Sequence, residues 1–268
     1  MNRRFLFRMI FCIAIIPVLI PSLALALTGR EIMERVDARD DGDNMTAEQE
    51  MTLIDKKGHE RIRRMNAYSK DKGRDSLRLM FFVSPADVKG TGFLTYDYYS
   101  GEKDDDQWLY LPELKKIKRI ATSDKSSAFM GSDFSYADMT KRVLDEWKYK
   151  ILKETEVRDK KCWLIEALPA SKTIEDRYGY TKSWVFVRQD IYMVVRAVHW
   201  VKDGRKLKYF DTRRIEEIDG ILIGTELNMK TVKNKKTLHR TVFRFHNVQF
   251  NQDIGEDLFT TRELEKGP

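Results

Sequence analysis

Residues 205–232, "RKLKYFDTRRIEEIDGILIGTELNMKTV", decide the fold class because apolar and polar residues alternate on both sides of a turn. Asp219 and Gly220 divide this stretch, and an Asp-Gly pair between alternating runs is a strong signal for a β-hairpin. A second Asp-Gly pair, at 203–204, separates it from "IYMVVRAVHWVK", which also alternates. These residues therefore predict neighbouring antiparallel strands joined by tight turns.

The same two-residue period extends outward from this stretch in both directions. It starts near Met45 and continues to "TLHRTVFRFHNVQF", which amounts to about ten or eleven strands without an internal linker or repeat. We therefore expect residues 27–268 to form one mainly β domain. An antiparallel sheet of this length twists and curls, which predicts a curved sheet, closed or partly open, around a cavity.

Two short helices are expected beside the sheet. Thr28 and Glu31 form a capping box ahead of an apolar stripe, and Ser135 with Asp138 repeats the arrangement later in the chain. Four residues after Ser135 have helical spacing, namely Tyr136, Met139, Val143 and Trp147. Two short helices cannot cover the concave side of such a sheet, so we expect them to act as a lid or plug.

Residues 1–26, "MNRRFLFRMIFCIAIIPVLIPSLALA", have the layout of a cleavable signal peptide. A basic head precedes a short, proline-interrupted apolar run that ends in a small-x-small triplet, so a membrane anchor is disfavoured. We expect the mature chain to be soluble and periplasmic. Its net charge falls from +7 to +4, because the leader carries three arginines and no acids. Only Cys162 remains, which excludes a disulfide scaffold.

No catalytic set, cofactor site or metal site is predicted. The four histidines lack metal-ligand spacing, and Asp104–Asp106 in "GEKDDDQ" are more simply explained as an acidic hairpin turn. Cys162 lies in an apolar strand and is interpreted as a small buried hydrophobe. With 34% charged residues of mixed sign, the surface does not indicate nucleic-acid binding. An enzyme acting on lipids remains a third hypothesis, behind a carrier and an interaction module.

Apolar residues at alternating strand positions are the candidate ligand contacts. The inward surface of a curled sheet exceeds what two short helices can cover, so it is expected to bind an acyl ligand or another protein. Methionines and aromatic rings suit flexible acyl chains. The candidate cavity residues are Met51, Leu53, Leu79, Phe81, Phe93, Trp108, Tyr110, Phe129, Met130, Phe134, Trp184, Phe186, Leu227 and Met229.

Three of these residues lie in the unusual stretch "SSAFMGSDFSYADM", residues 126–139. This stretch places aromatic residues and methionines in an expected loop, where they need apolar cover. We interpret it as a segment tucked over or into the mouth of the cavity. The alternative is that it fills the barrel permanently.

Two further stretches accompany this loop, namely "QWLYLPELKKIKRI" before it and "DLFTTRELE" near the end of the chain. Together the three resemble the outer-membrane lipoprotein-sorting protein family, the relatives of the periplasmic lipoprotein carrier LolA. The resemblance covers residues from about Met45 to Glu265. It implies an unclosed antiparallel half-barrel with helices across its opening, and a non-enzymatic role in carrying lipids or lipoproteins between envelope membranes.

The resemblance also bears on partners. Some family members resemble partners of inner-membrane exporters of the resistance-nodulation-division type, so a non-carrier module that docks on such an exporter is the alternative function. The lid-locking arginine of the family has three candidates by location, namely Arg61, Arg63 and Arg64. We expect a monomer, because charged residues on exposed strand edges disfavour pairing between copies.

Overall fold

The computed structural model describes residues 27–267. The predicted signal peptide, residues 1–26, lies outside the described residues. Within residues 27–267 no helix is both long enough and apolar enough to cross a membrane.

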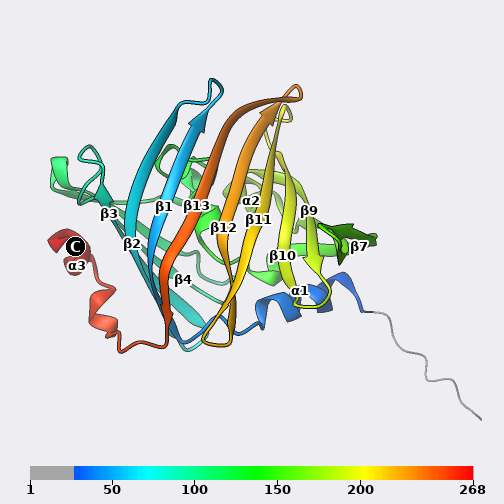
Figure 1. Cartoon of the computed structure of the whole chain (residues 1–268), viewed down its shortest axis with the longest axis horizontal. Coiled ribbons are helices and arrows are strands. Elements are labelled where there is room, and N and C mark those ends of the chain that lie inside the picture. Colours follow the sequence, from blue (N-terminus) through cyan, green and yellow to red (C-terminus); the bar gives the residue numbers. More distant parts are fainter. Residues whose placement is uncertain (1–26, 268) are drawn as a thin grey trace, which may run out of the picture.

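Thirteen strands form a single antiparallel sheet that curves without closing on itself (Figure 1). The predicted half-barrel is therefore confirmed, with thirteen strands where about eleven were expected. The strands are β1 (Asn44–Asp55), β2 (Glu60–Lys72), β3 (Asp75–Ser84), β4 (Gly92–Asp97), β5 (Asp106–Leu111), β6 (Lys116–Arg119), β7 (Trp147–Val157), β8 (Lys160–Pro169), β9 (Tyr180–Arg188), β10 (Met193–Val201), β11 (Lys206–Ile218), β12 (Ile221–Lys233) and β13 (Lys236–Phe250).

The strand order explains the position of the unusual loop. The order across the sheet is β6-β5-β4-β3-β2-β1-β13-β12-β11-β10-β9-β8-β7, so β6 and β7 are its two edges. The chain runs from the middle of the sheet to the β6 edge, and it resumes at the opposite edge with β7. Residues 120–146 must therefore pass from one edge to the other across the concave side. We call this segment the crossing connection.

Three α-helices flank the sheet: α1 (Gly29–Asp37), α2 (Lys172–Tyr178) and α3 (Thr261–Lys266). The predicted capping box of α1 is present, with Thr28 and Glu31 bonded reciprocally. Helices α2 and α3 were not expected, although Ser171 and Thr260 cap them in the usual way. Short 3₁₀ turns complete the described elements: η1 (Pro112–Leu114), η2 (Thr122–Asp124), η3 (Phe129–Gly131), η4 (Ala137–Met139), η5 (Leu144–Glu146) and η6 (Glu256–Leu258).

The helix predicted from Ser135 to Trp147 is wrong. Its box does form, since Ser135 and Asp138 are bonded reciprocally, but only η4 and η5 follow and Trp147 already begins β7. Side chains of the sheet take the carbonyl groups that a helix would use. Gln107 donates to the Tyr136 carbonyl at 2.9 Å and Arg78 donates to the Met139 carbonyl at 2.9 Å. Tertiary contacts thus replace the helical ladder after one turn.

Different segments cover different parts of the sheet. Helices α1 and α2 pack with β7–β9 through Ile32, Ile174 and Ile165, among others. The crossing connection packs on the concave side of β1–β5 and β13 through Phe129 and Phe134. On the outer face of β3–β5, the C-terminal segment with α3 (red in Figure 1) buries an apolar cluster of its own. No element within residues 27–267 covers the concave side between α1 and the crossing connection.

Candidate ligand-binding site

The uncovered part of the concave side is a hollow with a volume of about 520 Å³. Val36 of α1 borders it on one side, and Phe134 and Met139 of the crossing connection border it on the other. Strands β1–β4 and β10–β13 form its wall. Most of its lining is apolar: Met45, Ala67, Met80, Phe93, Met193, Val194, Phe210, Ile221, Leu222, Ile223, Leu227, Phe243, Phe245 and Phe250.

The strand registers explain why these side chains share one face. Met51 pairs with Phe243, and Phe243 pairs with Leu227, so all three project to the same side. Phe245 and Phe250 are an odd number of residues apart, yet both line the hollow. A β-bulge lies between them, where Asn247 has a φ of 50° and the register with β1 shifts by one. The extra residue returns Phe250 to the concave face.

A few polar side chains lie at the border of the hollow. Arg39 donates to the Leu222 carbonyl at 2.5 Å, and burial lowers the pKa of its guanidinium. Gln49 and Thr212 also contribute to the lining. Asp41, Ser69, Arg78, Thr95 and Asp138 complete the polar part of the lining, which the aliphatic and aromatic residues outnumber. The hollow therefore suits an apolar guest with little hydrogen-bonding capacity along its length.

The crossing connection fills the adjacent part of the concave side with aromatic rings. Phe129 is 0% exposed, and its ring centroid lies 5.0 Å from that of Phe93 and 5.7 Å from that of Tyr136. The Phe134 ring centroid lies 5.1 Å from that of Phe243. The predicted tucking of residues 126–139 against the concave side is thus what the structure contains. Here these rings form core, and the hollow begins beyond them.

Buried polar groups hold this loop in place. Asp133 is 3% exposed, and its carboxylate accepts from Thr231 at 2.5 Å and from Thr241 at 2.8 Å. His239 Nδ1 lies 2.7 Å from the same carboxylate. All three partners lie on β12 and β13, about a hundred residues later in the chain. Because a buried carboxylate needs several donors to replace water, this network fixes the loop against the sheet.

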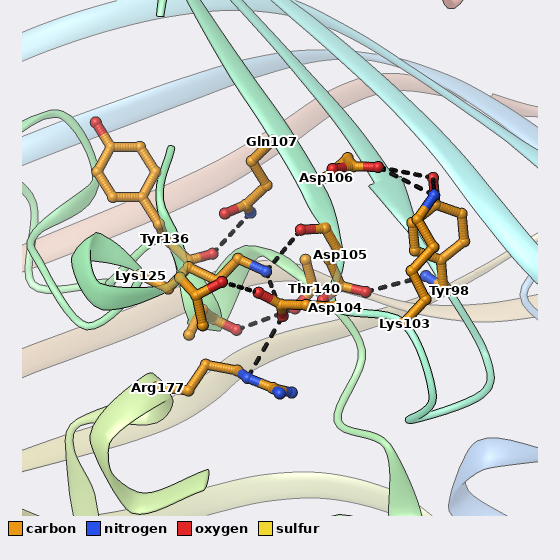
Figure 2. A network of polar contacts seen from close by, with 12 residues as sticks. Tyr98, Lys103, Asp104, Asp105, Asp106, Gln107, Lys125, Tyr136, Thr140 and Arg177 are labelled. Carbon is orange, nitrogen blue, oxygen red and sulfur yellow. Dashed lines mark hydrogen bonds and ion pairs between the residues drawn. The ribbon is translucent and has the colours of Figure 1, made fainter. Parts of the chain in front are cut away.

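The acidic turn before β5 is a second anchor of the crossing connection (Figure 2). Lys125, which is 2% exposed, bonds to the Asp104 carboxylate at 2.6 Å and to the Asp105 carbonyl at 2.7 Å. Arg177 of α2 lies 3.4 Å from the same Asp104 carboxylate, and Asp106 pairs instead with Arg119. The carboxylates of the three aspartates have different partners, although Lys125 also bonds to the Asp105 backbone carbonyl. They join β5, the crossing connection and α2, which is more than the predicted hairpin turn.

Of the three carboxylates in this turn, Asp105 is the one whose pKa is raised, whereas the pKa values of Asp104 and Asp106 are lowered. Burial, and then the nearby Asp97 carboxylate, raise the pKa of Asp105 to about 6. Burial also raises the pKa of Asp97, although Arg78 opposes this. The Asp105 carboxylate accepts a bond from the Tyr98 backbone N–H at 3.0 Å. Each of these two carboxylates therefore takes up a proton more readily than an exposed aspartate does.

The structure places eight of the fourteen predicted cavity residues on the concave side. In the sheet these are Met51, Leu53, Phe93, Leu227 and Met229, and in the crossing connection Phe129, Met130 and Phe134. Phe93, Phe134 and Leu227 border the hollow itself. The others belong to the apolar cluster beneath the crossing connection. That any of them contacts a ligand remains a prediction.

The other six predicted residues belong to the outer face. Leu79, Phe81, Trp108 and Tyr110 pack with Phe259 and Leu264 of the C-terminal segment, although Leu79 also borders the hollow. Trp184 contacts Trp200, and Phe186 packs against the small cluster around Val195. Alternation separates the two faces of a strand but does not say which face is concave. Because β3 carries apolar residues on both faces, its alternation could not identify the concave face, and residues of the outer face were predicted to line the cavity.

Among the three candidate lock arginines, one contacts the loop. Arg63 donates to the Met130 carbonyl, and Met130 itself has a φ of 46°. Arg64 pairs with Glu50 on the surface. Arg63 is thus the candidate that could act on the crossing connection. Within residues 27–267, no group of three or more histidine, cysteine or acidic side chains could hold a metal ion.

Comparison with known proteins agrees with this geometry. A family model with the description "-like: Uncharacterized protein" matches residues 74–266, which is more than half of the chain. A DUF1329 family protein from Desulfovibrio piger is 29% identical, with a TM-score of 0.80 over 88% of this chain and 97% of that one. The chain belongs to the family described by the model that matches residues 74–266, and its fold is LolA-like.

Two further solved structures support the LolA-like description. One, described as an outer membrane lipoprotein-sorting protein domain from Vibrio parahaemolyticus, is 28% identical with a TM-score of 0.80, covering 88% of this chain and 98% of that one. A LolA superfamily protein from Nitrosomonas europaea shares the fold at 18% identity, with a TM-score of 0.66 over 89% of this chain and 100% of that one. The search among curated proteins found no match. The resemblance inferred from the sequence is confirmed, and the fold is LolA-like.

Proposed function

We propose that this LolA-like protein is a periplasmic carrier that shields the acyl chains of a lipid or lipoprotein in the hollow of its half-barrel. The observation that carries the proposal is the unfilled apolar hollow of about 520 Å³ beside a loop that is already packed and anchored. Pockets that enclose small ligands usually have volumes of about 300–1,000 Å³. A non-enzymatic role agrees with the lipoprotein-sorting role after which the Vibrio parahaemolyticus protein is named.

The energetics of acyl burial are sufficient for a carrier. Each buried methylene contributes about 0.8 kcal/mol, so ten methylenes supply about 8 kcal/mol before the cost of association. Association itself costs about 4 kcal/mol or more, so the net affinity is weaker than this sum and increases with the number of buried methylenes. Few polar groups are needed along the chain, in agreement with the lining of the hollow.

The two free edges of the sheet support a carrier that acts as a monomer. Edge strand β6 is four residues long and carries Lys116, Lys118 and Arg119. Edge strand β7 carries charged residues along its length, including Lys148 and Lys150. Short or charged edges resist pairing with another sheet. The family resemblance is the ground on which we propose an exporter of the resistance-nodulation-division type as the membrane partner.

Lipid mass spectrometry on protein purified without detergent from its native periplasm tests the proposal. We expect a stoichiometric acyl species in the wild type and its loss in Phe245→Glu, which puts a charge into the hollow. His246→Glu is the matched control, since His246 is the next residue on β13 and is exposed. Wild-type protein without lipid and without dye uptake by the hollow would favour the docking module instead.

A further inference from the structure

A smaller chamber of about 190 Å³ adjoins the hollow and differs from it in chemistry. The two cavities share Phe134, Asp138, Val194 and Phe210 in their linings, so they lie next to each other. Beyond these residues the chamber is bordered by Arg142, Tyr149 and His199. The hollow is lined mainly by hydrocarbon, whereas the chamber offers several hydrogen-bonding groups close together.

Arg142 is the main cationic group of this chamber. Its guanidinium lies 4.5 Å from the ring centroid of Trp147 and 5.9 Å from that of Tyr180. These rings hold the side chain by stacking and cation–π attraction. No ion pair joins Arg142 to a carboxylate in the part of the chain that the structure describes. One guanidinium nitrogen lies 3.5 Å from His199 Nδ1, and the aromatic rings orient the remaining donors, which are available to an anion.

The neighbouring polar groups are also available as donors. The Tyr149 hydroxyl is buried and has no hydrogen-bond partner within residues 27–267. The Ser183 hydroxyl lies 2.7 Å from His199 Nδ1, and burial followed by the charge of Arg142 lowers the pKa of His199 to about 3. The imidazole is therefore neutral. Because the Arg142 guanidinium can only donate and lies 3.5 Å from Nδ1, we assign Nδ1 as the acceptor and the remaining proton to Nε2. A buried hydroxyl without a partner is costly unless a ligand supplies one.

The one acidic group of the chamber is already compensated. Asp138 Oδ2 accepts from the Ser135 N–H at 2.8 Å, the Ser135 hydroxyl at 2.8 Å and the Tyr180 hydroxyl at 2.7 Å. Burial opposes ionisation of Asp138, but the nearby charge of Lys208, whose Nζ lies 3.4 Å from the Tyr180 hydroxyl, helps to lower the pKa of this carboxylate. Lys208 and Arg142 therefore bring two positive charges to the surroundings of one carboxylate. The chamber therefore favours a negatively charged group.

We infer that this chamber, formed by Arg142, Tyr149 and His199, binds the oxyanion head of an amphiphile, a carboxylate or a phosphate, whose acyl chain occupies the hollow. The inference rests on the proposed carrier function and specifies the class of its ligand. The guanidinium supplies paired donors that match either oxyanion, and the Tyr149 hydroxyl and His199 Nε2–H add two more. Apolar burial supplies affinity along the chain, and the chamber selects an ionised head over a neutral one.

The test compares amphiphiles with one chain and different heads: palmitate, hexadecyl phosphate and hexadecanol, each below its aggregation threshold. Binding to the delipidated full-length mature protein is measured by calorimetry. We expect at least one anionic probe to bind about tenfold or more tightly than hexadecanol. A preference for palmitate identifies a carboxylate head, and a preference for hexadecyl phosphate identifies a phosphate head. Equal affinities for all three probes would overturn the inference while leaving the carrier function intact.

Two variants locate the selectivity. Arg142→Gln is expected to remove the preference for the anionic probes while hexadecanol still binds. Tyr149→Phe deletes a hydroxyl that has no protein partner, so stability is retained, and the affinity for the anionic probe is expected to fall about threefold to tenfold. Tyr209→Phe, on the outer face, is the matched control and is expected to change nothing. Selectivity that persists in both variants contradicts the inference, and failure of every probe to bind wild type contradicts the carrier function as well.

Discussion

The concave side of this half-barrel has two regions of similar composition and opposite organisation. In one region, Phe129 and Phe134 of the crossing connection pack against the concave face of the strands, and buried polar groups fix the loop there. Next to it, Phe245 and Phe250 line a hollow that no described segment fills. Both regions present phenylalanine and methionine from the same strands. An apolar inward residue is therefore core or ligand wall according to what lies opposite, which its own chemistry does not reveal.

The largest effect should come from the filled region. Phe129→Ala removes a fully buried ring and leaves a cavity between Phe93 and Tyr136. We expect the free energy of unfolding to fall by about 3–5 kcal/mol, as for other buried aromatic truncations. Chemical denaturation of the purified variant measures this loss. A loss below about 1 kcal/mol would show that the loop does not belong to the core.

The acidic anchor of the loop gives a pH-dependent effect. Because the folded-state pKa of Asp105 is raised to about 6, the folded state binds the extra proton, and stability decreases as pH rises from about 4 to above 6. Asp105→Asn removes this contribution. The free energy of unfolding of Asp105→Asn minus that of wild type should therefore increase by about 2–3 kcal/mol between pH 4 and pH 7.5. Denaturation curves at both pH values test this; a difference that is constant with pH would contradict it.

The polar anchor on β12 and β13 is expected to have a somewhat smaller effect. Asp133→Ala leaves the hydroxyls of Thr231 and Thr241 without their acceptor, which should cost about 2 kcal/mol. The loop should also exchange faster, so hydrogen exchange of residues 126–139 is the direct measurement. Protection should be retained in Asp190→Ala, which removes a surface carboxylate paired with Arg188. Unchanged hydrogen exchange of residues 126–139 in Asp133→Ala would show that the Asp133 network does not hold the loop.

The smallest effect on stability should come from the open region. Phe245→Ala truncates the same residue type as Phe129→Ala, but next to space that is already unfilled. We expect a loss of about 1 kcal/mol in the free energy of unfolding, mainly from the transfer of fewer apolar atoms. The same denaturation experiment checks it. A cost equal to that of Phe129→Ala would mean that the hollow is packed core in solution.

Local patterns predicted much of the architecture and only part of the site. Asp-Gly turns and alternation indicated an antiparallel sheet, and the capping box at Thr28 located α1. Helix α2 was missed, although Ser171 before it and Gly179 after it are ordinary boundary residues. Leu79 and Phe81 were assigned to the cavity because the residues of β3 are apolar in both phases of the alternation. The site residues Arg142 and Tyr149 carry no signal in a single sequence.

The sequence by itself determined the class of the molecule, since hairpin turns, strand alternation and helix caps depend on residues a few positions apart. Only the tertiary structure decided which face of the sheet is hollow. That depends on where distant segments pack: the C-terminal segment covers the outer face of β3–β5, and the crossing connection covers part of the concave face. Burial is a property of pairs of surfaces, so a strand pattern specifies two faces and the rest of the chain decides which one stays open.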